Sequence, residues 1–62
     1  MKKYRDMYYE ITETHLTYII ELYFDREKEI KVGSVELYKA GIIGDVDFDR
    51  FAKECIDDID RL

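Results

Sequence analysis

Residues 48–62 have the sequence FDRFAKECIDDIDRL, in which the apolar residues recur with the period of an α-helix. They share one helical face and are Phe48, Phe51, Ala52, Cys55, Ile56, Ile59 and Leu62. Asp47 precedes this pattern, and its carboxylate can accept hydrogen bonds from the free amides of the first turn. The stretch therefore predicts an amphipathic helix over residues 48–61, with Cys55 in the core rather than acting as a reactive thiol.

Residues 8–25, upstream of the helix, are rich in β-branched and aromatic side chains, which favour a sheet. Every second residue from 16 to 24 is a large apolar one, and this set is Leu16, Tyr18, Ile20, Leu22 and Phe24. An earlier strand is predicted by the same alternation in Met7, Tyr9 and Ile11. The turn between these two strands is expected near Glu13 and Thr14, and the next turn over residues 25–28.

Residues 29–39 permit two interpretations, because their apolar residues change phase across Gly33 and Ser34. A phase shift of one residue beside a glycine is typical of a β-bulge in a continuing strand. The alternative is a short helix over residues 34–40, with Ser34 as its N-cap. We prefer the bulged strand.

These elements predict a single small domain, residues 1–62, of the α+β class. Its expected architecture is a three-stranded antiparallel meander with the C-terminal helix packed on one face. One short helix cannot cover both faces of a sheet, so the second face is expected to be an interface. The residues expected on that face are Tyr8, Ile19 and Tyr23.

The size of the chain favours self-association. A domain of 62 residues buries only about 60% of the surface that its unfolded chain exposes. The chain has one cysteine and one histidine, His15, so neither a disulfide framework nor a zinc site can reinforce it. We therefore expect a homodimer, formed either face to face or edge to edge.

Charge points to a basic protein partner. The chain has 15 acidic and 10 basic residues, for a net charge of −5. An acidic ridge is expected along the end of the helix, where the main acidic residues are Glu54, Asp57 and Asp58. Its functional interpretation is a docking surface for a basic partner. The other interpretation, which such a group of charges usually has, is a solvated polar face that keeps a small protein soluble. Arg61 is expected to pair with Asp57, four residues earlier. Nucleic acid is a disfavoured partner, because the basic residues gather only in an N-terminal arm that contains Lys2, Lys3 and Arg5.

The segment from Asp45 to Asp49 resembles the start of a calcium-binding loop, because acids occupy its alternate positions. Such a loop needs glycine at its sixth position and glutamate at its twelfth, where this chain has Arg50 and Ile56. An acidic helix cap is therefore the preferred interpretation, and no cofactor is expected. A module that binds a small ligand or a divalent metal through these acids is the alternative.

No acid–base or nucleophile–base pair can be named, so we do not expect an enzyme. No signal peptide or membrane span is indicated, and the lone cysteine fits a reducing compartment, so the expected location is the cytoplasm. The expected function is that of a small acidic inhibitor or adaptor of a larger protein, in the manner of phage-encoded anti-defence inhibitors. A weak nucleic-acid binder that uses the basic arm is a further alternative.

Overall fold

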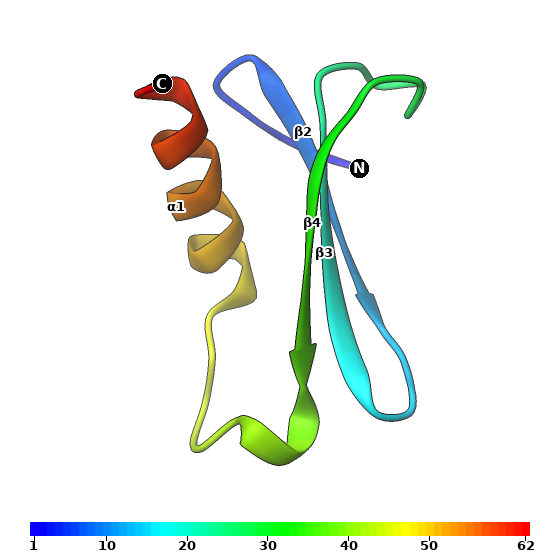
Figure 1. Cartoon of the computed structure of the whole chain (residues 1–62), viewed down its shortest axis with the longest axis vertical. Helices are drawn as coiled ribbons and strands as arrows, with labels where there is room; N and C mark the ends of the chain where they lie inside the picture. The colour runs from blue at the N-terminus through cyan, green and yellow to red at the C-terminus, as the bar shows by residue number, and fades with distance from the viewer.

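The sheet is a meander in which each strand pairs antiparallel with its neighbour in sequence, in the order β1-β2-β3-β4. In the computed structural model, which describes residues 1–62, the strands are β1 (Lys2–Tyr4), β2 (Met7–Glu13), β3 (Thr17–Tyr23) and β4 (Lys31–Tyr38). A single turn of 3-10 helix, η1 (Lys39–Gly41), follows β4, and the helix α1 is formed by Phe48–Asp60. Figure 1 shows α1 standing along one side of the sheet, with the connection from η1 crossing beneath both.

The prediction of three strands is wrong, because the N-terminal arm forms a fourth. Tyr4 pairs directly with Met7, so Arg5 and Asp6 alone make the turn between β1 and β2. Arg5 has a φ of 56°, a left-handed conformation that glycine or asparagine usually takes. The strand escapes sequence analysis because it is short and basic, and because arginine occupies the left-handed position of its turn, where glycine or asparagine is usual.

The bulged strand is confirmed and the short helix over residues 34–40 is not formed. Leu22 pairs with Gly33, whereas Tyr23 pairs with Lys31, so Val32 is an extra residue on β4. The bulge therefore lies one residue before the Gly33–Ser34 position at which the phase changes. A register shift of this kind lets the apolar residues on both sides of it stay on the helix side of the sheet.

The second predicted strand is correct in its centre and wrong at both ends. Leu16 and Phe24 lie outside β3 and are exposed, so they are not part of the core. Hydrogen bonds of the turns end the strand early. Thr14 accepts from the backbone N–H of Thr17 before β3, and the Asp25 carboxylate accepts from two backbone N–H groups after it.

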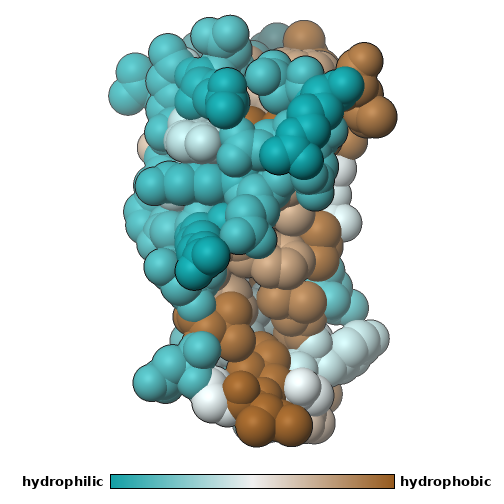
Figure 2. All heavy atoms as spheres, turned by 90° about the vertical axis from the view of Figure 1, so that its left-hand side faces the viewer, coloured by the Kyte–Doolittle hydropathy of each residue, from teal (hydrophilic) through white to brown (hydrophobic).

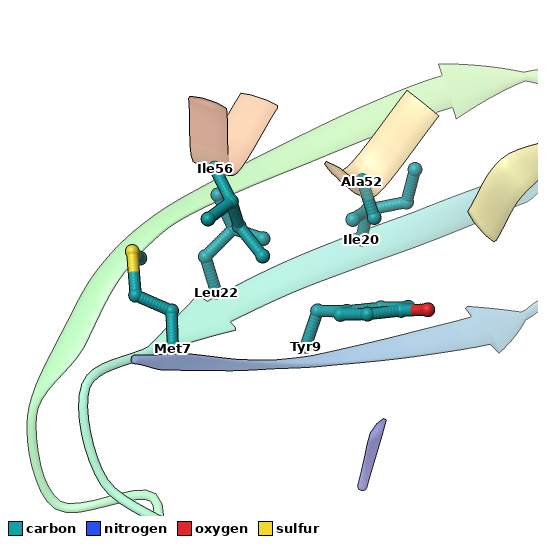
Figure 3. Packing of buried hydrophobic residues seen from close by; sticks show 6 residues of the cluster. All are labelled: Met7, Tyr9, Ile20, Leu22, Ala52 and Ile56. Carbon is teal, nitrogen blue, oxygen red and sulfur yellow. The ribbon is translucent and has the colours of Figure 1, made fainter. Parts of the chain in front are cut away.

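The core lies between α1 and the inner strands. Its six buried residues come from β2, β3 and α1, as Figure 3 shows, and are Met7, Tyr9, Ile20, Leu22, Ala52 and Ile56. The predicted helix is confirmed to within one residue, and its N-cap is Asp47, whose Oδ1 accepts from the Arg50 backbone N–H at 3.1 Å. The helix approaches β2 and β3 most closely, so the outer side of β4 is left without a covering element.

Candidate protein-binding surfaces

A shallow hollow lies where the connecting segment enters α1. We call it the N-terminal hollow, after the N-terminus of α1. Its lining residues are Asp45, Val46, Asp47, Arg50, Phe51 and Glu54. Two of these are apolar: Val46, which is 38% exposed, and Phe51, which is half-buried. Ile43 precedes the hollow in the same segment and is 96% exposed. The hollow thus combines accessible apolar side chains with carboxylates.

Figure 2 shows how the surface is divided on the side that carries α1. Hydrophobic atoms gather over the lower part, where the connection from η1 leads into the helix, and hydrophilic atoms cover the upper part. The connection itself contributes two exposed large hydrophobic residues, Ile43 and Val46. An apolar area bordered by charge is the usual composition of a protein-binding surface.

The carboxylates of the hollow differ in how firmly they are held. Asp47 is occupied as the helix cap. Glu54 pairs with Arg50 at 3.3 Å, but both side chains are largely exposed. An exposed pair of this kind contributes little free energy, so Glu54 can exchange Arg50 for a cation of a partner. No ion pair involves Asp45.

Only part of the predicted acidic docking surface is free to bind a partner. The Asp57 carboxylate, which is 28% exposed, accepts from Arg5 Nε at 2.6 Å and from the Tyr4 hydroxyl at 3.1 Å. The hydrogen bond from Arg5, helped by that from Tyr4, holds the pKa of Asp57 below its usual value. Asp57 therefore fastens the first hairpin to the helix. The exposed part of the predicted surface consists of Glu54 and Asp58.

The predicted pair of Arg61 with Asp57 is wrong. Arg61 instead lies 3.5 Å from Asp58, and both side chains are exposed. A second shallow hollow lies here, lined by Glu54, Asp57, Asp58 and Arg61, and it contains no apolar side chain. It offers only solvated charge, so it makes a weaker candidate site than the N-terminal hollow.

Two residues of the basic arm form ion pairs with acids of α1. Lys2 Nζ donates to Asp49 Oδ1 at 2.7 Å, and Arg5 pairs with both Asp57 and Asp60. We call these contacts the N-terminal ion-pair network. Lys3 lies over the ring of Tyr8. Because phosphate binding needs accessible cations, these ion pairs compete with the alternative of nucleic-acid binding by Lys2 and Arg5.

Asp49 belongs to the same network and also accepts a hydrogen bond from the sheet. The buried Tyr9 donates its hydroxyl to Asp49 Oδ1 at 2.8 Å. Burial, together with this hydrogen bond, raises the pKa of Tyr9 to about 12. Hydrogen bonds from Lys2 and Tyr9 lower the pKa of Asp49. Sequence analysis missed this arrangement, although the positive charge of residues 1–5 and the negative charge of residues 45–62 indicated it.

The acids from Asp45 to Asp49 have separate roles instead of a common centre. Asp47 caps the helix and Asp49 binds Lys2 and Tyr9. No three His, Cys, Asp or Glu side chains are grouped as metal ligands would be. The arrangement therefore favours the acidic cap over the metal-binding alternative.

Tyr8, Ile19 and Tyr23 lie on the sheet face opposite the helix, as the strand alternation predicts. Tyr8 and Tyr23 are direct cross-strand partners, and Ile19 is half-buried. Tyr23 is only 6% exposed in the single chain and donates its hydroxyl to Glu21 at 2.6 Å. Because ion pairs from Glu21 and Glu10 also lie on this face, it is more polar than the sequence predicts.

The two residues with reactive side chains have ordinary surroundings. His15 is exposed in the turn between β2 and β3. Cys55 is half-buried, and burial, followed by the nearby Asp58 and Glu54, raises the pKa of its thiol. A raised pKa disfavours the nucleophilic thiolate, in keeping with the predicted packing role.

Comparison with known proteins gives no relative: no family model, no curated protein and no solved structure matches this chain. None of its helices has the length and apolar character that crossing a membrane requires. The surfaces are therefore interpreted from their own geometry.

Proposed function

We propose that this protein is a small protein-binding module that captures a basic segment of a larger protein in the N-terminal hollow and so acts as its inhibitor or adaptor. The observation that supports the proposal is the combination of Val46 and Phe51 with the carboxylates of Asp45 and Glu54 in one hollow. The preferred segment has an apolar anchor beside a lysine or arginine.

The anatomy of the hollow supports a protein partner. Stable protein interfaces have an apolar centre that excludes water and a polar rim that sets orientation. Ile43 and Val46 are accessible without any rearrangement of the chain and can supply the centre. Glu54 and Asp45 can supply a rim that attracts cations, and the net charge of −5 favours the approach of a basic partner.

Selection of peptides from a random phage-displayed library on the immobilised protein tests the proposal. We expect enrichment of sequences that place an aromatic or aliphatic residue next to lysine or arginine. The double variant Ile43→Ser/Val46→Ser should weaken a selected peptide at least about tenfold, because it removes apolar anchors of the interface. Glu54→Gln should weaken it less and should reduce the dependence of the affinity on salt.

Glu27→Gln is the matched control, since Glu27 is an exposed acid in the turn after β3, outside the hollow. It removes the same charge as Glu54→Gln and should leave peptide affinity almost unchanged. Selection of the same peptides by the Ile43→Ser/Val46→Ser variant would contradict the proposal.

A further inference from the structure

We infer that two copies of this chain join along β4, as an antiparallel pair centred on Val35, to form one continuous sheet with both α1 helices on the same face. This surface is separate from the N-terminal hollow, so the inference does not depend on the proposed function. It also decides between the two dimer geometries that the sequence leaves open.

The outer edge of β4 is free to pair. This strand has eight residues, is the outermost in the sheet and contains no proline. The backbone N–H of Lys39 donates to Leu16 O at 2.9 Å, toward β3. Because the direction of backbone groups alternates along a strand, Ser34, Glu36 and Tyr38 direct theirs away from β3. Such a row is a template for another strand.

The opposite edge of the sheet, formed by β1, is unsuited to pairing. β1 has three residues, of which Lys2 and Lys3 carry charges that protect an edge against association. Pairing of β4 with β1 of another copy would be head to tail, and would build a larger ring or an open filament instead of a dimer. Pairing of β4 with itself uses the longer edge twice and closes after two copies.

The side chains and backbone directions of β4 determine the register of the pair. Centring the pair on Val35 places Ser34 of each copy opposite Glu36 of the other, and both positions have outward backbone groups. Centring it on Glu36 would place two carboxylates directly opposite each other, which is destabilising. Centring it on Leu37 would overlap less of the strand. Val35 therefore faces its own counterpart in a pair without direct hydrogen bonds, where the side chains are closest.

Apolar side chains of β4 remain partly exposed in the single chain and can be buried by a second copy. Val35 and Leu37 are only half-buried in the single chain, because α1 packs mainly over β2 and β3. Only eight residues of the single chain are buried, and its lone cysteine allows no internal disulfide. Joining the β4 edges sets these side chains beside those of the second copy and extends the apolar layer of a small core.

Light scattering over a concentration series gives the first test. The native chain should have a mass about twice 7.5 kDa. Glu36→Pro removes an outward N–H and keeps the hydrogen bonds to β3, so it should give a folded species of half that mass. Glu36→Thr keeps the N–H and should stay dimeric. A native mass of one chain, or a mass that keeps rising beyond two chains, would overturn the inference.

A disulfide test keeps the inference falsifiable if the proline variant fails to fold. In a Cys55→Ser background, Val35→Cys should form a linked dimer under mild oxidation, because paired Cα atoms about 4.5 Å apart suit a disulfide. Asp6→Cys, at the exposed turn beside β1, is the matched control and should remain mostly unlinked. Equal linking of the two variants would refute the proposed register.

Discussion

The two edges of the sheet differ in how they are joined to the helix. At the β1 edge, Lys2 and Arg5 reach across to Asp49 and Asp57 of α1, so charge fastens the outer strand. At the β4 edge the helix approaches less closely and leaves Val35 half-buried. The comparison shows that a single short helix can complete only part of a four-stranded sheet. We interpret the fastened side as structural and the other side as available to partners.

The largest expected effect contrasts the residues beneath the helix with those beyond it. Ile20 is fully buried, so Ile20→Ala should lower the free energy of unfolding by about 2–5 kcal/mol. Val35→Ala, measured on the Glu36→Pro single chain, should cost clearly less, because Val35 is already partly solvated. Urea denaturation followed by circular dichroism measures both. Equal losses would mean that the helix stabilises β4 as fully as β3.

The next largest effect on stability is expected from removing the contact that joins the β1 edge to α1. Asp57→Asn removes the charge that Arg5 and Tyr4 share. It should lower the free energy of unfolding by less than Ile20→Ala does, and by more than Asp58→Asn. Asp58 is the control because its pairing with Arg61 is exposed and long, at 3.5 Å. Thermal unfolding of the three variants gives the order, and an equal effect of the two Asn variants would contradict it.

Lowering the pH should weaken the same contact between β1 and α1. The pKa values of Asp49 and Asp57 are lower in the folded chain than in the unfolded chain. Their contribution is therefore complete above the ordinary aspartate pKa of about 3.9, and it is lost as pH falls through the lowered values. Denaturation between neutral pH and pH 3 should show falling stability, with a shallower slope in Asp49→Asn/Asp57→Asn. An unchanged slope in this variant would assign the acid sensitivity to other carboxyls.

The smallest effect separates ion pairs within the helix from those that cross to β1. Arg50→Gln removes an exposed pair with Glu54, four residues along α1. Its free energy of unfolding should change by less than about 0.5 kcal/mol. If Glu54 belongs to the binding hollow, the same variant should bind a basic peptide more tightly than the native chain does. Titration calorimetry checks the affinity, and weaker binding would remove Glu54 from the site.

The sequence predicts the parts of this molecule that depend on local periodicity. The helix from Phe48 and its Asp47 cap follow from apolar spacing and from the chemistry of the first turn. The bulged β4 follows from a phase shift beside glycine. These features need no knowledge of distant contacts, which explains why they could be predicted.

The sequence does not predict the parts that depend on distant partners. β1 has little strand propensity of its own and is held by β2 and by acids more than 40 residues away. For the same reason the acids of the helix seemed to form one docking surface, whereas Asp57 is used internally. The N-terminal hollow does not follow from the sequence, because periodicity places Phe51 only on the apolar face of the helix and gives Val46 no role of its own.

The order of the strands has a consequence for how the chain folds. All strand pairings join neighbours in sequence, so the sheet can assemble by successive closure of short hairpins. A much longer loop must close when α1 docks against the first strand, since Lys2 and Asp49 are 47 residues apart. The meander is therefore expected to form early, and docking of α1 with its pairing to the first strand to come last. Mutations in that docking should mainly speed unfolding and leave the folding rate nearly unchanged.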